Sequence, residues 1–316
     1  MKGNTRFGKR KLITFLTAAT LLLIPTVVLT FGKTLDSMFD RKEAVTDAQI
    51  IQDTQLSVES ASDVTGVSDI NALKEKYYWV NNNTKLEFSD FPVDKFLNED
   101  LSIHLDGDKP KILIFHTHSS EMYSDSDGKN SGVIGVGEKL KEELEQQYGI
   151  PTIHNTTAFD FVDGELTLIG AYERMEVEIK KILEENPSIE IVIDLHRDGV
   201  ANDTKLITTI NSKPTAQISF VNGLSKVYKD GNLEELDDLA NEYVYDNLAF
   251  SFNMLLLADQ LYPTYVNKVH VLPYRYSLHM IPKSLLIEVG AQTNTQLEAE
   301  NAVPILAEIL AKKILK

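Results

Sequence analysis

The chain has 316 residues, of which 43% are hydrophobic and none is cysteine. This content is enough for a large core and excludes wholesale disorder, while the lack of cysteine excludes disulfides, a cysteine nucleophile and thiolate metal sites. Five of the 31 basic residues lie in the first 11 positions, so the remaining chain holds 26 basic and 47 acidic side chains, a net charge of about −21. This large negative charge excludes nucleic-acid binding, because such binding depends on contacts of Lys and Arg with phosphates.

Residues 12–31, "LITFLTAATLLLIPTVVLTF", contain no charged side chain. About 20 such residues match the hydrocarbon thickness of a bilayer, and the basic cluster before them keeps the N-terminus in the cytoplasm. A cleaved signal peptide is the alternative, although no A-x-A-like cleavage site follows the apolar run. We therefore expect residues 1–33 to form a basic cytoplasmic tail and a single membrane anchor. The rest of the chain is then extracytoplasmic and held at the cell membrane.

The next segment, residues 34–84, is polar and acidic, as in "DAQIIQDTQLSVESASDVTGVSD". No helical or strand period persists in most of it, which predicts a flexible extracytoplasmic stalk. The folded domain is expected over residues 85–316.

Within that domain, strand-like and helix-like patterns alternate from residue 110 onward. Strands are predicted at 111–117, 150–157, 189–199 and 284–295, with two more at 206–212 and 216–223 for which a hairpin is one arrangement. Helices are predicted at 135–149, 170–187, 236–263 and 296–315. This alternation predicts a single α/β domain with a mostly parallel or mixed sheet covered by helices on both faces.

Three of the predicted strands end in polar side chains. The first runs into His116, His118 and Glu121, the third ends at His196, and the last carries Glu288 inside the apolar run "LLIEVG". Because parallel strands share one carboxyl edge, these side chains are expected to converge in one crevice. Strand alternation also predicts that His116 and His118 share a face.

This set of residue types is suited to hydrolysis with zinc. A hydrolytic Zn²⁺ site needs three His or carboxylate ligands and a further carboxylate that takes a proton from water. His118, Glu121 and His196 supply such ligands, and Glu288 supplies the base. Two alternatives remain open: strand-end histidines are often structural, and Glu288 could instead be a buried ion-pair partner of Arg197 or Arg275.

Two residues near Glu288 complete the predicted site. His279, in "RYSLHMIP", precedes the last strand, and Asn294 lies in the turn that follows it. We assign both to substrate binding.

The motifs "KILIFHTHSSEMY", "IEIVIDLHRDG" and "RYSLHMIPKSLLIEVGAQTNTQLEA", in this order behind an apolar N-terminal segment, resemble the stage II sporulation protein P family. The resemblance covers residues 85–316. It implies a membrane-anchored peptidoglycan hydrolase of endospore-forming bacteria, acting in septal wall thinning and engulfment. The implied activity is that of an N-acetylmuramoyl-L-alanine amidase, with possible endopeptidase activity on peptide cross-links, and the implied fold is similar to that of zinc-dependent amidases.

The resemblance also implies roles for single residues. It places zinc on His118 and His196 and the catalytic function on Glu288. The third ligand is Glu121 by the motif of this family, or Glu138 by analogy with the broader amidases, where the glutamate lies near the start of the first helix. Arg197 or His116 is expected to stabilise the oxyanion.

Partners follow from the resemblance alone: stage II sporulation proteins D and M, beside the peptidoglycan substrate. A function of a different class is a membrane-tethered scaffold that binds peptidoglycan for other hydrolases without catalysis. Stoichiometric zinc distinguishes the two, since a scaffold has no need of it.

Overall fold

A computed structural model describes residue 75 and residues 78–128 and 131–315 of the chain. The predicted anchor at 12–31 and most of the predicted stalk lie outside these residues. Among the helices of the described part, none is both long and apolar enough to cross a membrane.

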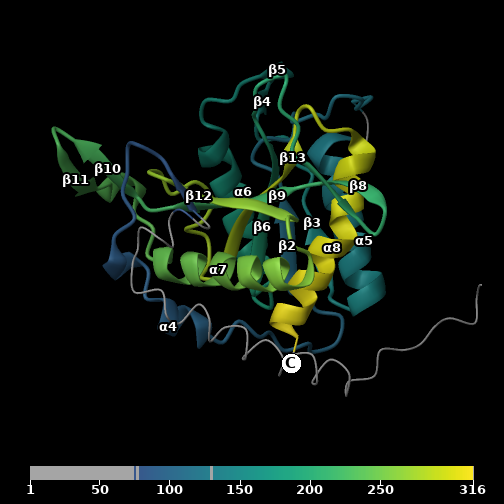
Figure 1. Ribbon diagram of the computed structural model, residues 1–316, viewed down its shortest axis with the longest axis horizontal. Helices are drawn as coiled ribbons and strands as arrows, with labels where there is room; N and C mark the ends of the chain where they lie inside the picture. The colour runs from purple at the N-terminus through teal and green to yellow at the C-terminus, as the bar shows by residue number, and fades with distance from the viewer. Residues whose placement is uncertain (1–74, 76–77, 129–130, 316) are drawn as a thin grey trace, which may run out of the picture. The chain divides into compact units, whose positions relative to one another are not determined.

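The larger elements alternate along the chain as expected for an α/β fold (Figure 1). The main sheet contains β1 (Tyr78–Val80), β2 (Ile112–Phe115), β3 (Thr152–His154), β6 (Ile191–Asp198), β9 (Ile218–Gly223), β12 (Val266–Leu272) and β13 (Ser284–Ala291). The α-helices are α4 (Val93–Leu97), α5 (Gly132–Tyr148), α6 (Ala171–Glu185), α7 (Val244–Leu261) and α8 (Gln296–Ile314), and short 3-10 helices occur at Phe88–Asp90 and Asp237–Leu239. Three small hairpins are formed by β4 (Phe161–Val162) with β5 (Glu165–Leu166), β7 (Ile207–Ile210) with β8 (Lys213–Ala216), and β10 (Lys226–Lys229) with β11 (Asn232–Glu235).

The main sheet has the strand order β1-β12-β9-β13-β6-β2-β3. Strands β1, β12 and β9 run parallel to one another, and so do β13, β6, β2 and β3, but β9 and β13 are antiparallel. The sheet is therefore mixed, made of two parallel blocks that meet at β9 and β13. This confirms the predicted α/β class with a mixed sheet.

Local sequence signals set the limits of two long helices. Helix α5 buries Leu140 and Leu144, which are one turn apart, and ends at Gly149 in the left-handed conformation with φ of 63°, where glycine is favoured because it has no Cβ. Helix α8 begins with a capping box in which the Thr295 hydroxyl accepts from the amide of Glu298 and the Glu298 carboxylate accepts from the amide of Thr295. These signals match the starts and stops predicted from the sequence.

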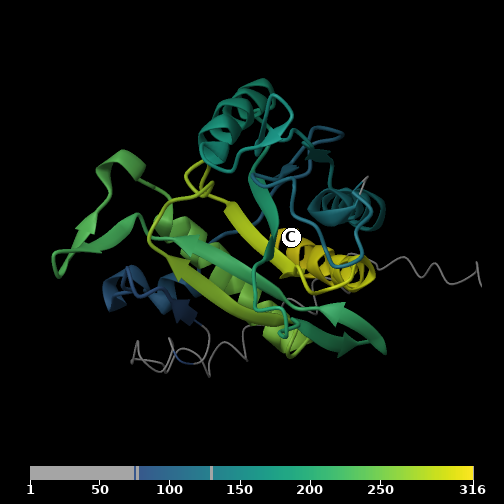
Figure 2. The same ribbon diagram turned by 90° about the horizontal axis from the view of Figure 1, so that it is seen from above.

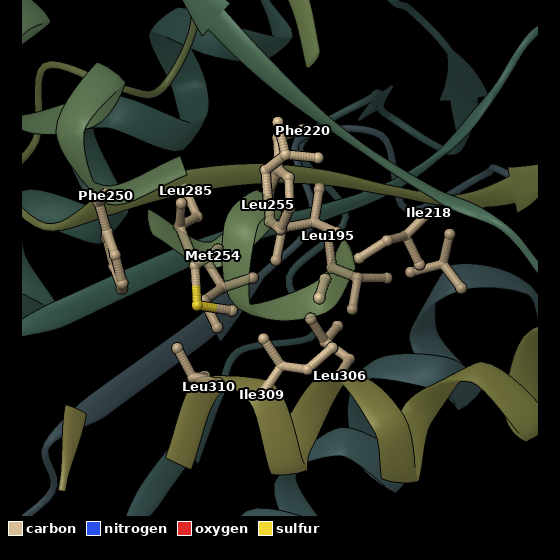
Figure 3. Packing of buried hydrophobic residues seen from close by; sticks show 14 of the residues in the cluster. Leu195, Ile218, Phe220, Phe250, Met254, Leu255, Leu285, Leu306, Ile309 and Leu310 are labelled. Carbon is tan, nitrogen blue, oxygen red and sulfur yellow. The ribbon is translucent and has the colours of Figure 1, made fainter. Parts of the chain in front are cut away.

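Helices cover both faces of the sheet. One face carries the large core with α5, α7 and α8, part of which is shown in Figure 3, where Met254 and Leu255 of α7 and Leu306, Ile309 and Leu310 of α8 pack beneath the strands. On the opposite face, α6 packs over β2 and β6, and residues 273–282 pack over β9 and β13. The site residues described below project from this second face.

Two strand pairings differ from the sequence prediction, in addition to the unpredicted strand β12 and the start of α7 at Val244 within the helix predicted over 236–263. Strand β1 pairs with β12 and belongs to the sheet, whereas the sequence places residues 78–84 in the stalk. Strand β7 pairs with β8, not with β9, so the predicted hairpin between 206–212 and 216–223 is wrong. Both differences arise from pairings that local periodicity does not encode.

The end of β9 gives a test of this packing. A Cβ atom on Gly223 would lie 2.0 Å from the carbonyl oxygen of Tyr274, whereas a Cβ on Gly199 would meet no atom within 4 Å. We expect Gly223→Ala to lower the free energy of unfolding by about 1–3 kcal/mol, because backbone must shift to relieve the contact. Gly199→Ala is the control and should change it by about 1 kcal/mol or less, in the stabilising direction. Equal values for the two variants in urea unfolding would contradict the packing described here.

Candidate active site

The site begins at the pairing of β6 with β13. In the parallel register of these strands, Glu288 is the neighbour of His196. Strand β2 lies on the other side of β6 and ends at Phe115, so the loop that follows it carries His118 and Glu121 to the same edge. The sheet therefore brings together side chains from three strand ends, as the sequence predicted.

Three of the predicted ligands are neighbours. The rings of His118 and His196 are 5.5 Å apart between centroids, and Nδ1 of His196 lies 3.3 Å from Oε2 of Glu121. The same carboxylate accepts a 3.0 Å hydrogen bond from the backbone amide of Arg197. Glu121 is thus fixed against β6, and it reaches the pair of histidines from the loop after β2.

Asp194 contacts both His196 and the loop after β2, and so supports the site from its buried side. Its fully buried carboxylate accepts hydrogen bonds from the amide and the hydroxyl of Thr117, at 2.9 and 2.7 Å, and lies 2.7 Å from Nε2 of His196. Burial lowers the pKa of His196, but the charges of Asp194 and Glu121 more than offset it, so the net pKa is well above the ordinary value. Asp194 has no role in the sequence prediction. The available signal was an acidic residue two positions before His196 in an otherwise apolar strand.

Glu288 is a half-buried acid with one buried carboxylate oxygen. Its Oε2 atom has no hydrogen-bond partner in the described structure. Burial raises its pKa to about 8, and the neighbouring charges of Glu121 and Asp198 add to this rise, whereas His196 opposes it. A pKa near neutrality is suited to a group that both accepts and returns a proton.

The alternative of an ion pair for Glu288 is wrong in the described structure. The guanidinium of Arg197 donates to the carbonyl oxygens of Met122 and Asp198, at 3.1 and 3.2 Å. Arg275 pairs with Glu176 at 2.8 Å. Arg197 therefore fixes the loop that carries Glu121, and its guanidinium is not directed at Glu288.

The residue types of the predicted ligands suit a metal ion, but their side chains are not arranged as a ready metal site. Among the described residues, no three His, Asp or Glu side chains are close enough together to form a ready metal-binding group. Nδ1 of His118 is, however, buried without a hydrogen-bond partner within the described part of the chain, a costly state that a bound cation would relieve. Two imidazoles and a carboxylate are also a common ligand set for Zn²⁺.

His116 does not share a face with His118, contrary to the prediction. Strand β2 ends at Phe115, so the alternation of a strand no longer applies at these positions. The ring of His116 is buried against α5, with Nδ1 2.7 Å from the carbonyl oxygen of Leu195 and Nε2 2.8 Å from Nε2 of His154. Burial and the nearby His154 lower its pKa to about 3, so the ring is neutral.

Glu138 lies with this second group of histidines. Its carboxylate is 2.8 Å from Nδ1 of His154, and the residue is exposed on α5. Glu138, His154 and His116 form a hydrogen-bonded row that ends at the backbone of Leu195. Of the two candidate glutamates, Glu121 is the one placed beside His196.

The two predicted substrate-binding residues are engaged elsewhere. His279 lies 3.2 Å from the carboxylate of Glu176 on α6. Asn294 is fully buried: its amide group donates to Leu206 and Glu298, and its oxygen accepts from the amide of Ala291. In this structure, Asn294 fixes the turn between β13 and α8.

Tyr172 is a site residue that sequence reasoning missed. Its ring packs edge-on against His118, with centroids 5.6 Å apart, and against Tyr276 at the same distance. Burial raises its pKa well above the ordinary value, and the charges of Asp194 and Glu288 raise it further. The first turn of α6 thus closes one side of the site with a protonated phenol.

These features define a candidate hydrolytic site: a partnerless acid beside two histidines and a second carboxylate, at the edge of a mixed α/β sheet. The profile of the Stage II sporulation protein P family matches residues 29–311. The chain belongs to this family.

A curated relative agrees with this assignment. The chain is 25% identical over 222 residues to Stage II sporulation protein P of Bacillus subtilis (strain 168). The match covers 65% of this chain and 51% of the relative, so the chain spans about half the length of the curated relative that it matches.

Solved structures with detectable similarity include several amidases. An N-acetylmuramoyl-L-alanine amidase from Clostridium difficile 630 is 15% identical, with a TM-score of 0.37, and the match covers 66% of this chain and 95% of that one. The CwlD amidase from Clostridioides difficile, in complex with the GerS lipoprotein, is 12% identical with a TM-score of 0.38 over 64% and 95% of the two chains. At these TM-scores the similarity does not by itself define the activity of this chain.

The raised pKa of Glu288 has a consequence for stability in metal-free protein. The folded chain keeps a proton on Glu288 up to about pH 8, whereas the unfolded carboxyl loses it near 4.5. The stability that this proton contributes is therefore fully present below pH 4.5 and is lost as the pH rises to 8. We expect Glu288→Gln to match wild type near pH 4.5 and to exceed it by about 1–3 kcal/mol at pH 8, a range reduced to allow for solvent screening at the pocket wall.

Urea unfolding in EDTA between pH 4.5 and 9 measures this difference. Glu184→Gln, an exposed carboxylate on α6, is the matched control and should follow the wild-type profile. A constant difference between Glu288→Gln and wild type at all pH values would contradict a raised pKa.

Proposed function

We propose that the chain is a zinc-dependent peptidoglycan hydrolase that cleaves the amide between N-acetylmuramic acid and L-alanine. One observation carries the proposal: Glu288, with a pKa of about 8 and a buried oxygen that lacks a partner, lies beside His196 in the paired strands β6 and β13. A buried carboxylate without a partner is costly and is usual where chemistry requires it. Membership of the Stage II sporulation protein P family supports the choice of peptidoglycan as substrate.

In this proposal His118, Glu121 and His196 hold the zinc ion. When bound, zinc supplies a Lewis acid that lowers the pKa of water toward neutrality. Asp194 keeps the ring of His196 in place from the buried side, and the amide of Arg197 does the same for the carboxylate of Glu121. Such supporting contacts typically change metal affinity by about 10- to 100-fold when they are removed.

Glu288 carries the protons. It accepts one from the attacking water and returns it to the amine of the leaving L-alanine. Because its pKa lies near neutrality, both transfers are feasible at the working pH. We assign neither His116 nor the guanidinium of Arg197 to the carbonyl oxygen of the substrate, because both ring nitrogens of His116 and the Nε and Nη1 atoms of Arg197 have partners within the chain.

The remaining predictions concern the cellular role, the membrane anchor, a second activity and the partners of the chain. Action in septal thinning and engulfment, a membrane anchor at 12–31, extra endopeptidase activity, and partnership with stage II sporulation proteins D and M stay predictions drawn from the N-terminal sequence and from the family. The non-catalytic scaffold is the second candidate function. It differs from the hydrolase in needing neither zinc nor Glu288.

Metal content and stem-peptide release test the proposal in the full-length chain. We expect one zinc ion per wild-type chain, lost in His118→Ala, Glu121→Ala and His196→Ala and kept in Glu138→Ala. Glu138 is the matched control because it pairs with His154 and Lys141 and not with His118 or His196. Glu288→Gln should keep zinc and release stem peptides from purified peptidoglycan about 100- to 10,000-fold more slowly.

Two results would overturn this assignment. Full activity of Glu288→Gln would remove its role as base. Wall binding by wild type without zinc and without peptide release would favour the scaffold.

A further inference from the structure

A pocket of about 520 Å³ extends from the proposed catalytic acid across the sheet to its edge. Glu288 lies at one end, and Trp79 of the edge strand β1 at the other. The pocket is lined by Trp79, Asp198, Gly199, Val221, Asn267, Lys268, His270, Leu272 and Glu288. It thus joins the proposed active site to a set of side chains that has no part in the chemistry described above.

The pocket exists because helices leave part of one sheet face uncovered. On the opposite face, Val269 and Val271 of β12 are fully buried against the core that contains α7. On the pocket face, Lys268, His270 and Leu272 are only half-buried, and Trp79 is 46% exposed. Figure 2 shows α6 on the β6 side of the sheet, where it packs on β2 and β6 and leaves β12 and β1 open.

The polar groups of the pocket are divided by charge. The carboxylates Asp198 and Glu288 lie at the catalytic end. Lys268 is the only Lys or Arg in the lining, and it forms no hydrogen bond or ion pair with any residue that the structure describes. A half-buried lysine at a pocket wall, without an acidic partner among the described residues, can pair with an anion from outside.

Trp79 and His270 form the wall at the edge of the sheet. They are paired across β1 and β12, and their rings pack edge-on with centroids 5.6 Å apart. Nε2 of His270 is buried and lacks a hydrogen-bond partner in the described part, and the carboxylate of Asp198 lies 3.8 Å from it. The wall thus offers an apolar surface and a free polar atom.

We propose that this pocket binds the stem peptide beyond the scissile amide, with Lys268 pairing with the carboxylate of the second peptide residue. This inference rests on the proposed function, because the scissile bond is placed at Glu288. Trp79 and Leu272 then contact the methylene groups of the peptide, and Lys268 provides a charge-assisted contact in a partly desolvated site.

The charge of Lys268 favours peptide over sugar as the occupant. The lactyl carboxyl of muramic acid is consumed in the amide, so the sugar side of the bond carries no charge there. The stem peptide carries a carboxylate on its second residue, one position beyond the L-alanine. A neutral sugar stacked on Trp79 would leave Lys268 buried without a counter-charge, which is unfavourable.

A matched pair of substrates tests this assignment in the full-length protein. The two are soluble N-acetylmuramoyl peptides that differ only in the α-carboxyl group of the second residue, a γ-linked D-glutamate, which is free in one and amidated in the other. We expect wild type to have a KM about 10- to 100-fold lower for the free acid. Lys268→Met should abolish this preference with kcat changed by less than about threefold, and Lys268→Arg should restore part of it.

Lys213→Met is the control, because Lys213 is exposed on the separate β7–β8 hairpin. It should keep the wild-type preference. An unchanged preference in Lys268→Met would overturn the proposal. Equal KM values of wild type for both substrates, together with a higher KM for both in Trp79→Ala, would also overturn it and would assign the pocket to the glycan.

The proposed function and the pocket fail in different ways. If wild type cleaves neither substrate, the proposed function fails, and the pocket is then tested by calorimetric binding of the same two compounds to wild type and Lys268→Met. Tighter binding of the free acid, lost in Lys268→Met, would support the pocket without any turnover. Equal affinity of wild type for the free acid and the amide would overturn the proposal for the pocket.

Discussion

The parallel pairing of β6 with β13 is the constraint on which the site depends. Its register places a carboxylate, Glu288, next to the imidazole of His196 inside two apolar strands. Because His196 is buried and Glu288 is half-buried, each charge changes the ionisation of the other more strongly than it would at a fully exposed surface. A shift of one residue would turn Glu288 into the opposite core and remove the acid from the histidines, so the pairing fixes both fold and chemistry.

The reversal of direction between β9 and β13 places the site beside an uncovered part of the sheet. On the β6 side of the sheet, α6 packs over β2 and β6 and covers them. Across the reversal, β9, β12 and β1 run the other way, and α7 packs on the opposite face. The catalytic edge of one block therefore borders an uncovered face of the other, and a polar pocket lies at this border. A sheet with all strands parallel and helices on both faces would bury it.

The sequence predicted the convergence of His118 and Glu288 because apolar runs mark buried strands and parallel strands share an edge. It misplaced His116 because the strand ends one residue earlier, where alternation no longer gives the direction of a side chain. The support given by Asp194 and the internal bonds of Asn294 depend on contacts between segments roughly 80 residues apart. No local pattern encodes the long-range contacts of Asp194 with Thr117 and of Asn294 with Leu206. The same holds for β1, whose partner β12 lies near the other end of the chain.

The position of Trp79 also determines what can be seen by optical spectroscopy. It is the single tryptophan of the chain, it is half exposed, and it lies in a strand of three residues at the edge of the sheet. Tryptophan emission from this protein therefore reports the polarity around one pocket wall, and the neighbouring imidazole of His270 lies close enough to quench it. Because a short edge strand frays more readily than the strands at the centre, a fluorescence transition would follow loss of the pocket and would precede the loss of the core.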